Sequence, residues 1–381
     1  MKVFTIPVVL LLLLQVIVLK AQTLTSSCSE FLVSPGAVFY VNGNFVNHNS
    51  GSFSNAGETT INGNLDNQGS LNTSGWLKIA GDFSHSGSSS HLAGMVELYG
   101  GNQTVSSLSQ LGFEWLILSG SSVKTMNSDI YITAFLDLTD CELNLNSHSA
   151  VIQSPNTNAI NRTSGFVSTG QNGRLYRYTS STGDYLFPLG SSSGTVRYRP
   201  VMIKPPSTTN TSYFAAFVNS SPGSGSMPVS ANDGSFCNLN DTWYHIAGNP
   251  AASTSGITVF YDPATDGNYN TLASWITNQW TSVPPVTQQP GSPLNGLFLS
   301  QWNPQTQQHI VPANPSQSLS LPSTASFCSG SSVTVSAGSG YSSYLWSNGA
   351  TTDSITVTAA GMYYVTVTSG SCNITDSILI S

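Results

Sequence analysis

Charged side chains are scarce in this sequence of 381 residues, of which only 7% are Asp, Glu, Lys or Arg. Its 10 Lys and Arg residues stand against 17 Asp and Glu residues, so the formal net charge is -7. Proteins that bind nucleic acid neutralise phosphates with a basic patch or stripe. This chain has no such stripe, and we predict that nucleic acid is not among its partners.

Motifs for metal binding and catalysis are also scarce. No pair of the 5 cysteines has the spacing of a metal site, and the sequence contains no H-E-x-x-H motif and no P-loop. General acid-base catalysis needs a histidine or a carboxylate placed within reach of a partner. The 6 histidines are scattered without a partner motif: His48, His85, His91, His148, His245 and His309. The sequence predicts no catalytic residue, no cofactor and no bound metal.

The one long hydrophobic run lies at the start of the chain. Met1-Lys2 is a short positive start, residues 3–19 are apolar, and Ala21 offers a small residue before a cut. This pattern predicts a secretory signal peptide over residues 1–21, and hence a secreted or cell-surface protein with no transmembrane span after its removal. The alternatives are a membrane anchor, for which the run is short, and a lipoprotein acylated at Cys28.

Regular helical patterns are absent, whereas Ser, Thr, Asn, Gln and Gly are abundant between short alternating runs of Val, Ile, Leu and aromatic residues. Such runs suit strands and tight turns. We predict an all-β protein with an N-terminal parallel β-solenoid over residues 22–155, a middle antiparallel β-sandwich over 156–303 and a C-terminal immunoglobulin-like sandwich over 318–381. Residues 304–317 are rich in Pro and Gln and are predicted to form an extended linker.

The solenoid prediction rests on an internal repeat. Asn42-Gly43-Asn44-Phe45 returns as Asn62-Gly63-Asn64-Leu65, and glycines recur at positions 51, 69 and 87, a period of 18 residues. A period near 20 residues is typical of solenoids, in which each coil buries its apolar residues against the next. Stacking places Asn44, Asn64 and Asp82 above one another, where we expect hydrogen-bonded ladders. Calcium binding by these side chains is the less favoured alternative.

Acidic residues near the end of the solenoid raise the question of polysaccharide cleavage. Asp137, Asp140 and Glu142 lie close together, but strand alternation puts Cys141 on the inner face and turns Asp137 and Glu142 outward. We interpret them as part of a solvated face. The carboxylates of Asp262 and Asp266 likewise fit ordinary turn chemistry better than cation binding.

The last segment contains the strongest local pattern. Cys328, Trp346 and Cys372 follow the Cys…Trp…Cys order of an immunoglobulin-like sandwich. This resemblance implies a disulfide between Cys328 and Cys372 that packs on a buried indole. The pairing of Cys28, Cys141 and Cys237 stays open at this stage.

Three stretches resemble the secreted multidomain surface proteins of gliding, type IX-secreting bacteria. Residues 328–335, 344–357 and 361–368 are similar to their immunoglobulin-like, PKD-type domains, and Tyr185-Leu-Phe-Pro-Leu-Gly190 is similar to a sandwich that follows their Asn/Gly-rich solenoids. The group includes adhesins and enzymes with appended modules. Such proteins usually end in a further β-domain that serves as the export signal. The present sequence stops at Ser381, inside the last predicted strand, so we expect either a truncated reading frame or a different export route.

Three functions are compatible with these features. The first is a non-catalytic structural or adhesion protein whose partner is an extracellular glycan or protein surface, with the solenoid as rod and the sandwiches as interaction modules. The second is carbohydrate binding by exposed aromatic rings of the middle sandwich, and the third is a β-helix polysaccharide-degrading enzyme. The candidate ligand-binding rings are Trp243, Tyr244, Trp275, Trp280 and Trp302. The oligomeric state is left open.

Overall fold

The computed structural model describes residues 17–19, 23–27, 29–88, 91–108, 110–249, 251, 254–304, 307–369 and 372–381. Strands make up 54% of the chain and helices 2%, which confirms the predicted all-β class. Within the described ranges, no helix is long and apolar enough to cross a membrane. The predicted signal peptide lies outside the described residues except for β1 (Ile17–Leu19), and Cys28 also lies outside them.

The chain divides into two compact units. The first contains Met1–Ser220, Trp243–Val259 and Ser300–His309. The second contains Ser221–Thr242, Phe260–Leu299 and Ile310–Ser381.

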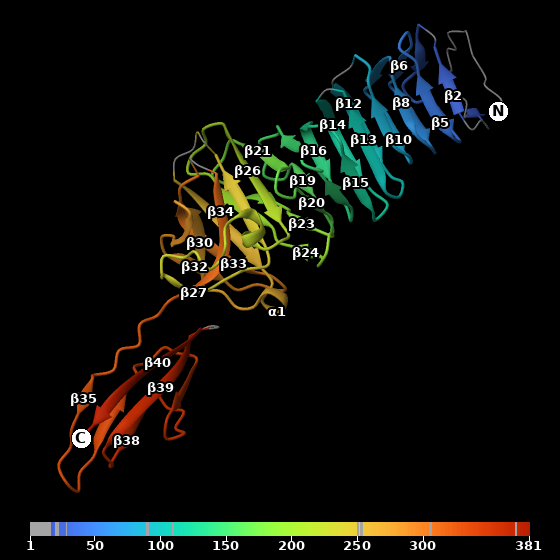
Figure 1. Cartoon of the computed structure of the whole chain (residues 1–381). Coiled ribbons are helices and arrows are strands. Elements are labelled where there is room, and N and C mark those ends of the chain that lie inside the picture. Colours follow the sequence, from blue (N-terminus) through green and yellow to red (C-terminus); the bar gives the residue numbers. More distant parts are fainter. Residues whose placement is uncertain are drawn as a thin grey trace. The chain divides into compact units, whose positions relative to one another are not determined.

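A parallel β-solenoid forms most of the first unit, as the repeat predicted (Figure 1). One of its faces is an eight-stranded sheet, here sheet A, made of β2 (Thr23–Ser26), β5 (Asn44–Asn47), β8 (Leu65–Asn67), β11 (Phe83–His85), β13 (Gln103–Ser107), β15 (Val123–Met126), β17 (Glu142–Asn144) and β20 (Phe166–Ser168). A second face, sheet B, runs from β1 through β4 (Val38–Val41), β7 (Glu58–Ile61), β10 (Trp76–Ile79), β12 (His91–Leu98), β14 (Leu111–Leu118), β16 (Ile130–Asp137) and β18 (Ser149–Ile152) to β21 (Arg174–Thr179). The short β19 (Ile160–Asn161) pairs with the end of β16.

The first coils have a third face, sheet C, made of β3 (Phe31–Val33), β6 (Ser52–Asn55) and β9 (Ser70–Thr73). Later coils replace the third strand with the first half of a long, bent strand. In β12 the register shifts between Leu92 and Met95, and Gly94 there has a φ of +75° that favours glycine. The coil therefore changes from three strands to two between β9 and β12.

The repeated glycines form one column at a corner of the coils. Gly69 lies over Gly51, and Gly87 lies over Gly69. A Cβ atom on Gly87 would overlap the carbonyl oxygen of Gly69 in the preceding coil. The period of 18 residues thus marks a corner at which the backbones of successive coils lie too close together to admit a side chain.

The corner residues predicted to form ladders do so, through backbone amides. The N–H of Asn64 donates to the Oδ1 atom of Asn44 at 2.9 Å, and the N–H of Asp82 donates to Oδ1 of Asn64 at 2.8 Å. The N–H of Thr104 continues the ladder to Oδ1 of Asp82 at 2.7 Å. These oxygens are therefore structural acceptors rather than members of a cation site.

A second ladder is buried inside sheet A. Asn47 donates from Nδ2 to Oδ1 of Asn67 at 2.7 Å, and Nδ2 of Asn67 lies 2.9 Å from Nδ1 of His85. All three side chains are at most 2% exposed. Because a buried polar group costs free energy unless it is hydrogen-bonded, this ladder fixes the register of one coil on the next.

The solenoid continues past residue 155. β20 pairs in parallel with β17, and β21 pairs in parallel with β18. On its other side β21 pairs antiparallel with β26 (Thr211–Val218), which pairs with β28 (Tyr244–Gly248). The remaining antiparallel strands of the first unit are β22 (Tyr185–Phe187), β23 (Gly190–Ser191), β24 (Arg197–Tyr198), β25 (Val201–Lys204) and β29 (Ser255–Tyr261).

Arg177 joins the last coil to the segments around it. Its side chain is fully buried, and Nη1 donates to the carbonyl of Leu186 at 2.7 Å. Nη2 donates to the carbonyls of Asn156 and Thr157 at 2.9 and 3.1 Å. Burial lowers the pKa of Arg177 to about 10. The guanidinium thus donates to one carbonyl of β22 and to two carbonyls of the segment between β18 and β19.

The predicted linker over residues 304–317 is wrong for most of its length. Residues 308–315 form β34 (Gln308–Pro315), which pairs with β27 (Phe236–Leu239) and β30 (Thr271–Ile276) in the second unit. Ile310 and Val311 are at most 2% exposed. Pro312 has no N–H to donate within the sheet. Its carbonyl faces β27, where it accepts from the N–H of Asn240 at 2.9 Å, so the pairing of β34 with β30 does not need the missing N–H.

The second unit also contains η1 (Pro222–Gly225), α1 (Pro263–Asp266), β31 (Gln279–Ser282), β32 (Val286–Gln289) and β33 (Asn295–Trp302). Its C-terminal part is the predicted two-sheet sandwich. One sheet has the order β35 (Thr324–Ala325), β40 (Cys372–Ile380), β39 (Gly361–Ser369), β37 (Ser343–Trp346), and the other pairs β36 (Val333–Ser336) with β38 (Ser354–Val357). Trp346 is 2% exposed and lies in the core between them.

The disulfide predicted between Cys328 and Cys372 is wrong. Cys372 is bonded to Cys237, 135 residues away, and Cys328 is free and exposed. Cys328 precedes β36, whereas Cys237 lies in β27 of the same unit. The order Cys…Trp…Cys therefore predicts the sandwich but not which cysteines form its disulfide. Cys141 is free and buried.

We expect Gly87→Ala to lower the free energy of unfolding by about 1–3 kcal/mol, because the new Cβ overlaps a backbone carbonyl that cannot move aside. Urea denaturation of the full chain measures this. The matched control is Gly101→Ala, since a Cβ there meets nothing within 4 Å. Equal stability of the two variants would contradict the stacked glycine column.

A peptide map under non-reducing conditions should recover Cys237 and Cys372 in one linked species, with Cys328 alkylated without reduction. Cys372→Ser should destabilise the second unit by up to about 5 kcal/mol, since the bond closes a long loop. Cys328→Ser is the control and should leave stability unchanged. A linked peptide containing Cys328 would overturn the assignment.

Candidate functional site

Four of the five predicted ligand-binding rings are core residues. Trp243, Tyr244, Trp280 and Trp302 are at most 1% exposed. The Nε1 atom of Trp280 donates to the carbonyl of Met227 at 3.3 Å, and that of Trp302 donates to Oε1 of Gln308 at 2.8 Å. A ring that solvent cannot reach offers no face to a sugar, so these four rings stabilise the fold.

Trp275 is the fifth predicted ring, and it is half-buried. It packs edge-on against Trp280, with ring centroids 5.2 Å apart. One partly exposed ring whose edge is already covered does not make the coplanar platform that stacking on a sugar chain needs.

The acidic residues considered for catalysis are dispersed by the fold. Asp137 faces outward as predicted, and its carboxylate accepts from the backbone N–H of Thr139 at 2.9 Å. Asp140 is exposed, and the hydroxyl of Ser121 holds the pKa of its carboxyl below the usual range. Glu142, predicted to face outward, is 9% exposed because Ser192 covers it and donates to its carboxylate.

Ser192 also lies at the centre of a G-x-S-x-G pattern formed by residues 190–194, which sequence reasoning overlooked. In hydrolases this pattern marks a nucleophile on a strand-to-helix turn with a histidine in reach. Here the residues connect β23 and β24, two antiparallel strands, and Ser192 donates to a carboxylate. The pattern therefore belongs to a hairpin.

The turn at Asp262 and Asp266 is ordinary capping, as predicted. Oδ1 of Asp262 accepts from the N–H of Ala264 at 3.0 Å at the start of α1, and Oδ2 of Asp266 accepts from the N–H of Asp262 at 2.9 Å. In the part of the chain that the structure describes, no group of three or more His, Cys, Asp or Glu residues is arranged to hold a metal ion.

Lys124 is a buried cation that sequence reasoning missed. Its side chain is fully buried in sheet A, and Nζ donates to the carbonyls of Gly100 and Gly101 and to Oε1 of Gln103 at 2.6–2.9 Å. Burial lowers the pKa of Lys124. The Nζ donors of Lys124 are all bonded to acceptors at one corner of the preceding coil, so this lysine stabilises the contact between two coils.

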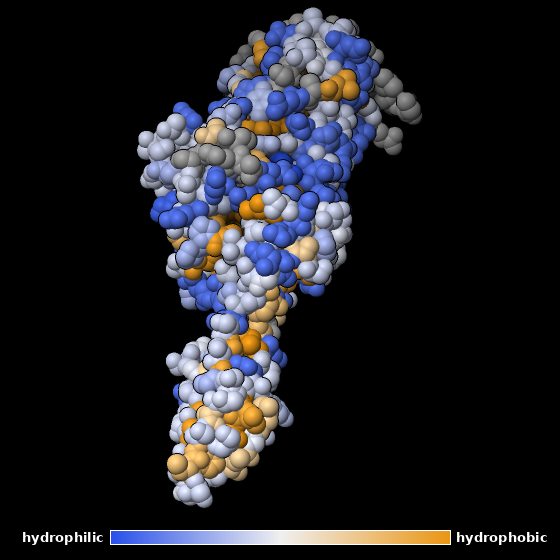
Figure 2. Space-filling model, turned by 60° about the vertical axis from the view of Figure 1, so that its left-hand side comes forward, coloured by the Kyte–Doolittle hydropathy of each residue, from blue (hydrophilic) through white to orange (hydrophobic). Residues whose placement is uncertain are grey.

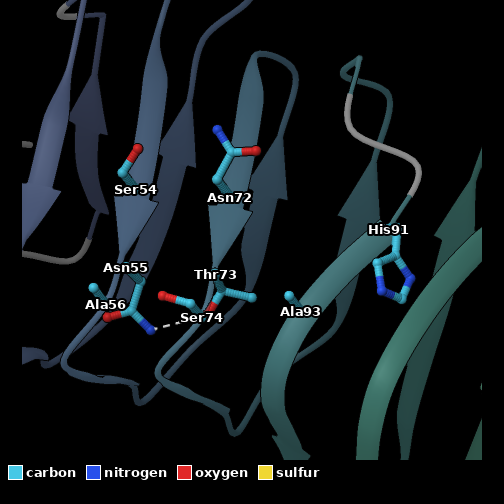
Figure 3. A pocket seen from close by; sticks show the side chains of 8 residues that line it. All are labelled: Ser54, Asn55, Ala56, Asn72, Thr73, Ser74, His91 and Ala93. Atoms are coloured by element: carbon cyan, nitrogen blue, oxygen red, sulfur yellow. Dashed lines mark hydrogen bonds between the residues drawn. The ribbon is translucent and has the colours of Figure 1, made fainter. Parts of the chain in front are cut away.

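A cavity of about 290 Å³ opens on the solenoid surface where sheet C gives way to β12. Ser54 and Asn72 project from neighbouring strands β6 and β9 on the same side, and His91 lies at the start of β12 (Figure 3). The lining residues are Ser54, Asn55, Ala56, Asn72, Thr73, Ser74, His91 and Ala93. Every polar group in this set is an amide, a hydroxyl or an imidazole.

The floor of the cavity is fixed by hydrogen bonds. Nδ2 of Asn55 donates to Oγ1 of Thr73 at 3.2 Å and to the carbonyl of Trp76 at 3.2 Å. Oδ1 of Asn55 accepts from the hydroxyl of Thr59 at 2.9 Å. Asn55 and Thr73 are buried, whereas Asn72 and Ser74 at the rim are exposed. The rim side chains are thus accessible to a ligand above a hydrogen-bonded base, and Asn72 itself donates to the hydroxyl of Ser70 at 3.3 Å.

His91 at the edge of the cavity is held by a second ring. Its imidazole stacks on Tyr131 with ring centroids 5.7 Å apart and an angle of 10° between the planes. His91, Gly112 and Tyr131 are in register on β12, β14 and β16. Tyr131 lies across Gly112, where a Cβ would overlap the end of its ring. Glycine at position 112 is therefore what allows the two rings to meet.

Further along the same strands, outward-facing apolar residues form a row. Trp76, Met95, Trp115 and Phe135 are in register on β10, β12, β14 and β16. Trp115 is 40% exposed and packs on Phe135 at 5.2 Å between centroids. Lys78, which is paired with Glu58 at 2.7 Å, lies 3.7 Å from the ring centroid of Trp76. The outward face of sheet B therefore carries rings that sequence reasoning did not single out.

In the face shown in Figure 2, hydrophobic residues occur as separate patches between polar ones. Strand alternation places an outward ring beside inward-facing neighbours such as Leu77 and Val96, which are fully buried. Alternation alone would have identified the row once the strand register was known.

We expect Gly112→Ala to displace the ring of Tyr131 from His91 and to change the free energy of unfolding by less than about 1 kcal/mol, because the clash is with the end of a flexible side chain. Side-chain NMR shifts of His91 and Tyr131 report the stacking, and urea denaturation reports stability. Unchanged ring shifts would contradict the arrangement described here.

The chain matches no protein-family model. Comparison with curated proteins finds no match, and comparison with solved structures finds none either.

Proposed function

We propose that this protein is a non-catalytic structural and adhesion protein displayed outside the cell, in which the solenoid is a stiff rod and the sandwiches are interaction modules. The observation that carries the proposal is the parallel pairing of sheet A from β2 to β20 together with its side-chain ladders. In repeat proteins each coil contacts only its neighbours, and continuous stacking produces an extended surface suited to binding.

The proposal includes export by the signal peptide at residues 1–21 and membership in the group of surface proteins of type IX-secreting gliding bacteria. Two features support it. The order of an Asn/Gly-rich solenoid, antiparallel strands and a final two-sheet sandwich follows the order of that group. The buried Trp346 lies where an immunoglobulin-like core holds its indole.

Polysaccharide cleavage is the competing function, and it receives less support from the geometry. The carboxylates at positions 137, 140 and 142 accept hydrogen bonds from neighbouring side chains or backbone, and Glu142 is buried. Glycoside hydrolysis needs two carboxyl groups facing one bond from opposite sides.

Antibody raised against the full chain should label intact cells of the source organism as strongly as permeabilised cells. Beads coated with the full chain should adhere to those cells or to their extracellular matrix, and should release no sugar from polysaccharides. The matched pair Gly87→Ala and Gly101→Ala tests the role of the rod, since only the first disturbs coil stacking. Adhesion should fall with the first variant and persist with the second. Labelling that requires permeabilisation, or release of reducing sugar, would sink the proposal.

A further inference from the structure

We infer that the cavity between β9 and β12 binds a neutral oligosaccharide. The inference rests on the proposed adhesion function and names the ligand through which it acts. It moves recognition from the middle sandwich, where four of the five candidate rings are buried, to the solenoid.

The lining selects for an uncharged, hydroxyl-rich ligand. None of the residues around the cavity is Asp, Glu, Lys or Arg. Asn72 offers an amide, whose Nδ2 also donates to the hydroxyl of Ser70 at 3.3 Å, and Ser54 and Ser74 offer hydroxyl groups. These groups match the paired donor and acceptor character of sugar hydroxyls. An anionic sugar would find no cation in the lining and would meet a protein of net charge -7.

Size and rigidity also suit a sugar. A volume of about 290 Å³ lies just below the range of small-molecule sites, about 300–1,000 Å³. The Asn55–Thr73 bond beneath the rim is made before any ligand arrives. A preformed base lowers the ordering cost of binding.

His91 supplies the ring of the site, and Tyr131 holds that ring from outside the lining. Sugars present C–H groups on one face and hydroxyls at their edges, and rings with polar tips match both. His91 lines the cavity, and the parallel stack on Tyr131 holds its plane in one orientation. Gly112 is the position that makes this stack possible. The site thus combines a fixed ring wall with a neutral polar rim.

The test titrates the full chain with cellohexaose, mannohexaose, maltohexaose and the anionic hexagalacturonate by isothermal titration calorimetry. At least one neutral hexasaccharide should bind about tenfold more tightly than hexagalacturonate. Asn72→Ala and His91→Ala should each weaken that binding about fivefold, and Gly112→Ala should weaken it because it moves Tyr131. Binding that is equal in the variants and the unchanged chain would overturn the inference, as would a preference for hexagalacturonate or no binding of any neutral sugar.

Matched controls use the same residue types elsewhere on the solenoid. Asn127→Ala and His148→Ala remove side chains that bond Asn146 and Asp129 outside the cavity, and both should bind the sugar within about twofold of the unchanged chain. The bead assay separates the two proposals. Adhesion that survives in the cavity variants overturns this inference alone, whereas sugar binding by a chain that fails to adhere overturns the adhesion function alone.

Discussion

Backbone hydrogen bonds between successive coils are the constraint on which the solenoid depends. They require neighbouring coils to approach as closely as strands of one sheet, about 4.8 Å. At the corners that approach leaves no space for a Cβ, which is why Gly51, Gly69 and Gly87 are stacked. Inside the coil it brings Asn47 and Asn67 within hydrogen-bonding distance, so that buried polar groups are satisfied by their own equivalents one coil away.

The same constraint explains where a site can form. As long as three strands of one coil lie on three of the next, the surface is even. Between β9 and β12 the third strand is replaced by the bent half of a longer one, and the register shift beside Gly94 separates the two surfaces. A cavity opens there, and the residues that line it include members of the paired strands β6 and β9 and of the start of β12. Recognition is thus expected at the irregular coil.

Sequence reasoning succeeded where the determinants are local. The glycine period and the Asn corners fix the solenoid, because each depends on residues about 20 positions apart that meet in the next coil. It failed where contacts with segments far away in the sequence determine burial and bonding. The burial of Trp243 depends on which segments cover it, and Cys372 bonds a partner 135 residues away. The linker prediction failed because two apolar residues, Ile310 and Val311, are enough for a strand when partner strands lie on both sides.

The continuation of parallel pairing into β20 and β21 has a consequence for dividing the chain into fragments. A fragment that ends at residue 155 keeps β17 and β18 but removes the strands that cover their edges. Open strand edges of this kind recruit further strands, from other molecules if none is present in the same one. A soluble solenoid fragment therefore has to carry the last coil and the antiparallel strand β26 that closes it.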